Sequence, residues 1–265
     1  IVGFIGNFDG YINNFKTSGD FKTPYGHLKA DIQLNPEKKR KLTFVGSVSS
    51  DNFEPGLLFM KDSIVGKTQF SVNAKGFLAE SNKIFAQIDW NIKSVILKNI
   101  EFRDIIGNGT LDNKTFDGTV KVDDERLAFE VKGNFNFSDT NPQFKFEANL
   151  EHANLLALNI MPQDSITNIS FNVTANFKGN SINKFDGEIR LKEVNFEKKD
   201  KKLNINKIEV YTTDNQFSND LQFRSDFLDA TIFGRYDIAD IPGAIIRTIR
   251  AFLPGSFYGY QSDEP

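Results

Sequence analysis

The chain has 265 residues, of which 39% are hydrophobic and 25% are charged, and its 32 Lys and Arg against 35 Asp and Glu give a formal net charge of -3. This near balance, with a sequence pI of about 5.6, argues against steered binding to nucleic acid. The chain has no cysteine and 2 histidines, which excludes disulfides, thiolate metal sites and cysteine nucleophiles. Its 27 phenylalanines favour β structure with a bulky apolar face.

The chain opens on Ile1–Ile5, which is typical of a strand and contains no basic segment or leader. We therefore expect the sequence to be part of a longer protein. The longest apolar runs, Gly56–Met60 and Ala244–Ile246, fall far short of the roughly 20 residues that a membrane-spanning helix needs. We expect a soluble piece, with any targeting signal or anchor outside it.

Apolar and polar residues alternate through most of the chain. Between positions 126 and 137, for example, Leu127, Phe129 and Val131 share one face, and Glu130 and Lys132 occupy the other. The same period recurs at 28–34, 42–48, 70–76, 84–92, 116–122, 144–151, 169–177, 185–191 and 221–227. One dry and one wet face are typical of antiparallel sheet. The pattern predicts an all-β chain with about fifteen strands or more.

Glycine recurs inside these segments two residues after an apolar residue, as in Phe44-x-Gly46 and Val131-x-Gly133. Interior glycines usually mark a bend, a bulge or the close approach of another group. We therefore expect a repeatedly curved sheet with room over its inner face. The Asp-Gly pairs at 9–10, 117–118 and 186–187 are expected at hairpin turns.

Two segments have helical periodicity. The first, Glu151–Ile160, is short. The second spans 240–253, where Asp240 can cap, Pro242 suits the first turn and Pro254 follows the end. Its two arginines are few for a helix lying on lipid, so we expect it over the open face or the end of the sheet.

The expected organisation is a β segment over 1–238, an amphipathic helix over 239–254 that is associated with the groove or its end, and a tail over 255–265. Motifs for chemistry are absent from these parts. Gly107-Asn108-Gly109 lacks the third glycine of a dinucleotide loop. His27 falls on the polar face of its strand, and His152 falls at the start of the first helical segment. We predict no catalytic residue, no metal site and no cofactor, and a protein that is not an enzyme.

The apolar face leaves two interpretations open. Its Phe and Leu side chains could form the closed core of a β-sandwich or barrel. Alternatively, the face could stay unpaired as an open trough that holds a hydrophobic cargo. The excess of phenylalanine and the glycines within strands favour the trough.

A succession of short motifs resembles the TamB family of translocation-and-assembly proteins, in the form found in Bacteroidota. The match covers roughly residues 3–240, and the family's membrane anchor is not within it. The motifs, in chain order, are Gly10–Thr23, Tyr25–Ile32, Phe44-Val45-Gly46, Asp51–Leu58, Phe116-Asp117-Gly118, His152–Leu158 and Arg224–Ala230.

The resemblance implies a β-taco, an open half-pipe in which a long sheet folds lengthwise around an apolar groove. TamB-like proteins are related to the AsmA-like, bridge-type lipid transfer proteins. They are anchored in the inner membrane, extend through the periplasm, and reach an Omp85-family barrel (TamA-like) in the outer membrane. Two roles follow for this chain: a groove that carries phospholipid between the membranes, or an assembly and insertion factor for outer-membrane β-barrel proteins in protein secretion. A purely structural β-sandwich module is the third possibility.

On this interpretation, the groove is lined by the apolar residues of the alternating segments. They are Leu28, Ile32, Phe44, Phe70, Val72, Ile88, Trp90, Phe116, Val120, Leu127, Phe129, Val131, Phe135, Phe144, Phe146, Leu150, Ile169, Phe171, Val173, Phe177, Ile189, Leu191 and Phe223.

Overall fold

Alternating residues make extended strands, and in the computed structural model of the chain these strands join into one sheet of 15 strands. The structure describes residues 3–37, 41–58, 60, 64–79, 83–140, 142–160, 168–179, 186–198, 201–214 and 219–233. The strands are β1 (Gly3–Tyr11), β2 (Asn14–Thr23), β3 (Gly26–Glu37), β4 (Lys41–Phe53), β5 (Val65–Ala79), β6 (Ile84–Leu97), β7 (Ile100–Asp112), β8 (Thr115–Asp124), β9 (Leu127–Asn136), β10 (Gln143–Asn154), β11 (Asn168–Lys178), β12 (Asp186–Lys198), β13 (Lys201–Asp214), β14 (Asn219–Ser225) and β15 (Asp229–Phe233).

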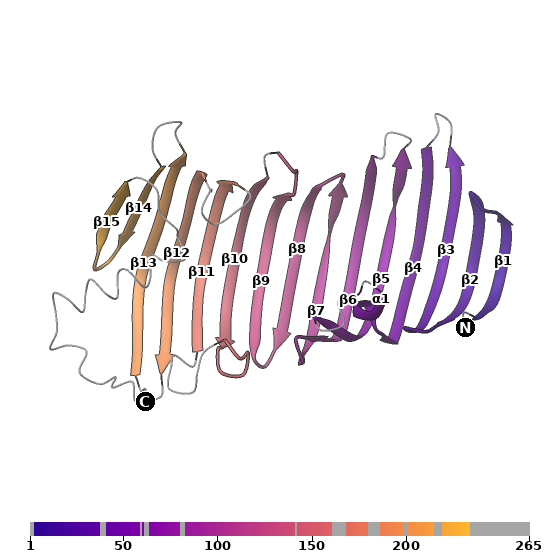
Figure 1. Cartoon of the computed structure of the whole chain (residues 1–265), viewed down its shortest axis with the longest axis horizontal. Coiled ribbons are helices and arrows are strands. Elements are labelled where there is room, and N and C mark those ends of the chain that lie inside the picture. The colour runs from indigo at the N-terminus through magenta and orange to yellow at the C-terminus, as the bar shows by residue number, and fades with distance from the viewer. Residues whose placement is uncertain are drawn as a thin grey trace.

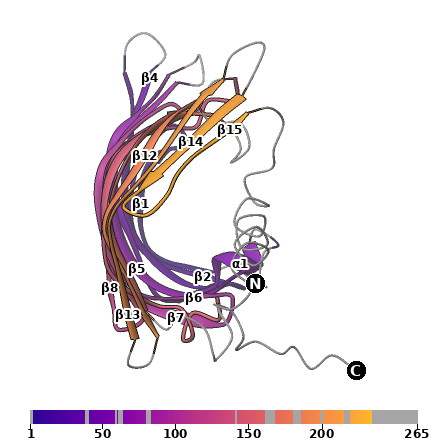
Figure 2. The same cartoon turned by 90° about the vertical axis from the view of Figure 1, so that its left-hand side faces the viewer.

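Each strand pairs with its neighbours in the sequence, so the order in the sheet is the order in the chain (Figure 1). Every pairing is antiparallel, as one dry and one wet face predict. The expected open, curved, all-β sheet is therefore confirmed, and a closed β-sandwich is not what these strands form. One short helix, α1 (Pro55–Leu58), lies on the open side of the curved sheet (Figure 2).

Directly paired residues share a face of an antiparallel sheet, and the register therefore aligns the apolar residues into rows that cross the strands. One such row, which we call the crease row, contains Phe70, Ile92, Ile105, Val122, Phe129, Leu150 and Phe171. The rows run along the long axis of the sheet, at right angles to the strands.

Irregular pairing is concentrated beside the crease row. The register shifts between Ser50 and Phe53 in β4, at Phe70 where β5 meets β6, between Leu150 and His152 in β10, and just after Ser170 in β11. Bulges bend the strand that carries them and increase its twist. A line of them at one level folds the sheet lengthwise, which gives the curved cross-section in Figure 2.

The chain's own core lies along this crease. The buried apolar residues next to the bulges are Phe53, Val95, Val122, Ala128, Ala153, Val194 and Ile205. Five of the seven are alanine or valine. Away from the crease, the buried apolar residues among those described are Ala86, Ala175 and Leu221. The stable packing of this fold is therefore a line along the bend and not a layer between two sheets.

A buried carboxylate closes one hairpin at the crease. Asp124 is 4% exposed and accepts hydrogen bonds from Nε and Nη2 of Arg126, at 2.9 and 3.0 Å. It also accepts from the backbone N–H groups of Arg126 and Arg103, at 2.9 and 3.0 Å. The Arg126 guanidinium and these N–H groups hold the pKa of Asp124 below its ordinary value of 3.8.

Three expectations of local structure differ from the observed fold or lie outside it. The Asp-Gly pairs 9–10, 117–118 and 186–187 lie within β1, β8 and β12 and not in turns. A Cβ at each of these glycines would come within 2.2–2.3 Å of a backbone oxygen, so the close approach of the backbone there requires glycine. The predicted helix at Glu151–Ile160 is wrong: β10 continues to Asn154, and a hydrogen-bonded turn follows. Pairing with β9 and β11 outweighs the local periodicity there. The predicted helix at 239–254 and the tail lie outside the described residues.

We expect the buried carboxylate of Asp124 at the crease to make a contribution to stability that is lost in acid. Asp124→Asn should lower the free energy of unfolding by about 2 kcal/mol at neutral pH, since hydrogen bonds to a charged group each contribute about 1.5–3 kcal/mol and Arg126 is partly exposed. The folded-state pKa of Asp124 is depressed, so its contribution is present above the unfolded-state pKa and is lost as the pH falls through the folded-state value.

Urea unfolding of both proteins between pH 7 and pH 3 measures this. The difference between them should shrink on acidification, and Glu125→Gln, on the exposed side of the same turn, should match the wild type throughout. A difference that grew as the pH fell would contradict the assignment.

Candidate functional site

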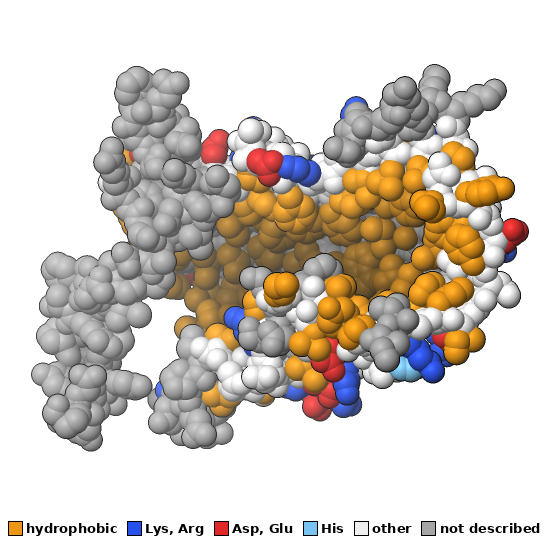
Figure 3. Space-filling view, turned by 45° about the vertical axis from the view of Figure 1, so that its right-hand side comes forward, with side chains coloured by type: hydrophobic (Ala, Val, Ile, Leu, Met, Phe, Trp, Pro, Cys, Tyr) orange, Lys and Arg blue, Asp and Glu red, His pale blue; other side chains and the backbone are white. Residues whose placement is uncertain are grey.

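The concave face of the sheet is a hollow lined by apolar side chains (Figure 3). Every residue predicted above to line a groove lies on this face and is half-buried. Side chains in a packed core are fully buried, and isolated apolar side chains on a surface are largely exposed. Half-burial of a whole face means that the side chains pack sideways on one another, without a second layer of described residues above them. We call this hollow the groove.

The floor of the groove is made mostly of glycine, alanine and valine, with Trp90 and Leu191 as the larger members. Its central row contains Gly19, Ala30, Val48, Val72, Trp90, Gly107, Val120, Val131, Ala148, Val173 and Leu191. The row on the crease side is larger and includes Phe129 and Phe171. The row on the other side is again mostly small, with Gly109, Gly118 and Gly133, and the large rings of Phe116, Phe135 and Phe144 form the next row beyond it. Small residues in the middle and large ones at the sides deepen the groove along its length, which for 15 strands spaced about 4.8 Å apart is roughly 70 Å.

Glycines let the largest floor side chains lie flat. A Cβ on Gly107 would come within 2.1 Å of the Trp90 ring, and a Cβ on Gly109 or Gly118 within 2.5–2.6 Å of the Phe116 ring. Each ring therefore covers the bare backbone of a neighbouring strand instead of standing up into the groove. The interior glycines anticipated from the sequence thus keep the groove open.

Aromatic rings form a continuous band along the groove. Trp90 contacts Phe116 with ring centroids 5.9 Å apart, and Phe116 contacts Phe135 at 6.3 Å. The band continues from Phe135 to Phe146 at 5.6 Å and on to Phe177 at 6.5 Å. Such pairs add stability beyond the area that they bury. The band helps to fix the shape of a face over which the described residues place no second layer.

Sequence reasoning missed part of this face. β7 contributes Ile105, Gly107, Gly109 and Leu111, none of which the alternation singled out as lining residues. The doublet Ile105-Ile106 and the two glycines break the apolar/polar period in the sequence. Ile106 instead lies on the outer face, where it is 47% exposed. Only the register with β6 and β8 assigns this strand correctly.

The outer face is polar and holds a shallow depression of about 620 Å³. It crosses β2 to β7 and is lined by Lys16, Asp31, Asn73, Lys75 and Asp89, among others. These are ordinary solvated side chains of the wet face. This depression lies on the outer face and not in the groove. The polar, hydrated surface and the apolar hollow are therefore on opposite faces of the sheet.

The described residues do not place a cluster of charged or metal-binding side chains in the groove. Within the described parts of the chain, no three His, Asp or Glu side chains gather as a metal site would require. His27 is exposed on the outer face, and Nε2 of His152 lies 3.1 Å from the carbonyl oxygen of Glu125. The described residues also contain no helix with the length and apolar character needed to cross a membrane. The groove can bind an apolar ligand through hydrophobic contact over a large area.

Comparison with protein-family models, with curated proteins and with solved structures finds no match for this chain. The resemblance to TamB therefore rests on the sequence motifs and enters below only as part of a proposal.

The flat rings predict a specific response to a methyl group. Gly107→Ala should lift the Trp90 ring from the floor, because the three atoms nearest to the new Cβ all belong to that ring. Trp90 is the 1 tryptophan of the chain, so its emission reports this directly. We expect a red shift as the indole enters water, with a cost of about 1–3 kcal/mol in stability from overpacking.

Gly3→Ala is the matched control, since its nearest neighbour would be at an ordinary 3.8 Å. An unchanged emission maximum in Gly107→Ala would show that the ring does not depend on the glycine.

Proposed function

We propose that this chain is a lipid-conducting segment, in which the groove shields the acyl chains of phospholipids from water while they move along it. The observation that carries the proposal is the apolar concave face, which is half-buried and over which the described residues place no second layer. A binding surface of this kind does not need polar side chains that converge on one point of the ligand. This agrees with the described residues, whose charged side chains do not cluster in the groove.

The energetics favour such a cargo. Exposing an acyl chain to water costs about 0.8 kcal/mol per methylene, so two long chains cost on the order of 20 kcal/mol. The groove face is itself in contact with water, and covering it contributes about 25 cal/mol per Å² of apolar area. Contact between groove and acyl chains removes both exposures together. Movement along the groove then exchanges one apolar contact for another.

The resemblance to TamB adds a cellular location and partners to this proposal. The parent protein would be anchored in the inner membrane through a segment outside this sequence, span the periplasm, and meet an Omp85-family, TamA-like barrel in the outer membrane. Phospholipid would be the occupant of the groove. This localisation and these partners are part of the proposal and rest on the motifs quoted above.

An edge strand favours a second candidate function, assembly of outer-membrane β-barrel proteins. β1 has β2 as its one neighbour among the described strands. Its Ile5 and Phe8 are 66% and 56% exposed. An exposed edge with apolar side chains can accept another strand. Photocrosslinkers at Phe8 and Val131 separate the candidates: protein adducts at Phe8 favour assembly, and lipid adducts at Val131 favour conduction.

The proposal predicts that a charge in the groove removes bound lipid. Trp90 should be quenched by phospholipid that carries a nitroxide on an acyl chain, and lipid should be detected by mass spectrometry of the purified chain. Phe146→Glu places a carboxylate on the floor, and we expect at least about a tenfold loss of affinity, the effect of 1.4 kcal/mol. Ile106→Glu makes the same kind of change on the outer face.

Circular dichroism and urea unfolding establish that both variants fold. Loss of quenching in Phe146→Glu alone supports the proposal. Equal lipid occupancy in wild type, Phe146→Glu and Ile106→Glu would refute it.

A further inference from the structure

The two rims of the groove differ in chemistry. The connection from β4 to β5 carries exposed apolar side chains: Leu57 and Leu58 in α1 are 42% and 45% exposed, and Met60 and Ile64 are 89% and 43% exposed. We call Pro55–Leu58, Met60 and Ile64 the first lip. Its helix, α1, lies on the open side of the curved sheet (Figure 2). Residues of this kind at the edge of an apolar hollow extend its apolar surface toward the mouth.

A second lip, Leu155–Ile160, lies on the same rim. It follows β10 as the first lip follows β4, and both strands run toward this rim. Leu155, Leu156 and Leu158 are half-buried, and Ile160 is 62% exposed. Hydrogen bonds from the backbone N–H groups of Leu158 and Ile160 to Asn154 and Leu155 fix its turn. Two apolar lips thus come from one side of the mouth.

The first lip is held firmly at its base. The Glu54 N–H donates to the carbonyl of Tyr25 at 2.7 Å, and the Lys98 N–H donates to the carbonyl of Ile64 at 2.9 Å. The Phe53 ring packs edge-on against Phe70, with centroids 6.4 Å apart. The lip is therefore a fixed part of the groove mouth.

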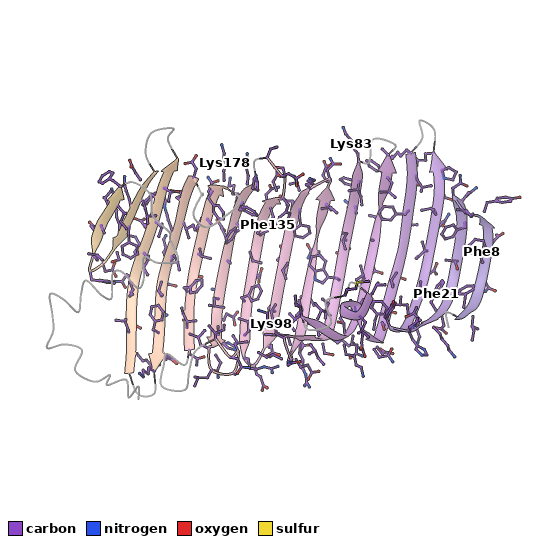
Figure 4. All side chains as sticks on the ribbon, viewed as in Figure 1. Phe8, Phe21, Lys83, Lys98, Phe135 and Lys178 are labelled. Carbon is purple, nitrogen blue, oxygen red and sulfur yellow. The ribbon has the colours of Figure 1, made fainter. Side chains whose placement is uncertain are left out.

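The opposite rim presents polar side chains at the far ends of the same strands. β5 leaves the first lip and ends near Lys83, and β11, the strand that comes after the second lip, ends at Lys178. Figure 4 shows both lysines on the rim opposite Lys98. Between them lie Lys114 and Asp139, which form an ion pair. Phe137 on this rim turns its ring onto Phe144.

Lys83 and Lys178 are exposed, and among the described residues neither ammonium group has an ion-pair or hydrogen-bond partner. Each lip thus has, on the opposite rim, a lysine that forms no ion pair with another described residue; Lys178 is the register partner of Asp186 in β12. An amphiphile with an apolar tail and a phosphate-bearing head would satisfy both rims at once.

We propose that the mouth of the groove orients its cargo: the acyl chains lie beneath the two lips, and the phosphate headgroup lies along the rim of Lys83 and Lys178. This inference rests on the proposed function, since it assigns an orientation to the same occupant. The polar turn Lys98–Asn99 separates the lips on their own rim, so the tails of one lipid lie under one lip.

Two labelled positions test the orientation. The chain has 0 cysteines, so Met60→Cys and Thr140→Cys each accept a single fluorophore, one on the first lip and one on the opposite rim. The probes are phosphatidylcholine with a nitroxide on the choline group and phosphatidylcholine with a nitroxide on an acyl chain. We expect the headgroup probe to quench position 140 several-fold more than position 60, and the acyl probe to do the reverse.

Trp90 in the same samples reports whether the groove is occupied. Equal or reversed quenching at the two rims, with Trp90 quenched by the acyl probe, would overturn the orientation and leave the lipid groove intact. Absence of quenching at Trp90 and at both labels would overturn the proposed function and the orientation together.

A charge series gives an independent readout. Lys83→Glu with Lys178→Glu should weaken capture of phosphatidylglycerol from vesicles several-fold more than it weakens capture of an uncharged diacylglycerol. Lys98→Glu, on the rim of the lips, is the matched control and should leave the ratio unchanged. An equal effect of the two charge changes would contradict the assignment of the headgroup to the Lys83 and Lys178 rim.

Discussion

The structure depends on one constraint: an antiparallel meander with a strict register places its apolar side chains on one face, and the described chain supplies no second layer to cover them. Val72, Trp90 and Val131 occupy positions that would be a core in a sandwich, yet they are half-buried. The sheet meets this constraint by curving, which brings the two walls toward each other and reduces the water-exposed apolar area. The hollow that remains is the groove, the candidate ligand-binding surface.

Two devices make the curve without filling the hollow. Bulges beside the crease row fold the sheet along a line, and the true core, with Phe53, Val95 and Val194, lies in that fold. Glycines such as Gly107 then let rings lie flat on the floor. The packed core along the crease and the open floor of the groove are thus different parts of the sheet. The binding surface can therefore stay open without loss of the packing that holds the strands together.

Much of this could be predicted from the sequence, because period-two alternation reports directly which side chains share a face. The residues named in advance, from Leu28 to Phe223, all lie on the concave face. Other features depend on pairing between strands. Ile105-Ile106 hides β7 from a period-two search, Asp117-Gly118 resembles a turn although it lies within β8, and Glu151–Ile160 has helical spacing although its first part pairs in β10. Neither the line of bulges nor the contrast between the rims can be predicted from any one segment, since both require the register of many strands.

The central claim is that none of the described residues forms a layer over the concave face. Hydroxyl-radical footprinting of the lipid-free protein, read residue by residue at the phenylalanine rings, measures this most directly. The account predicts that Phe135 and Phe146 are oxidised readily, that buried Phe53 is protected, and that added phospholipid protects Phe135 and Phe146 without changing Phe53. Rings at Phe135 and Phe146 that are already as protected as Phe53 in the absence of lipid would contradict it.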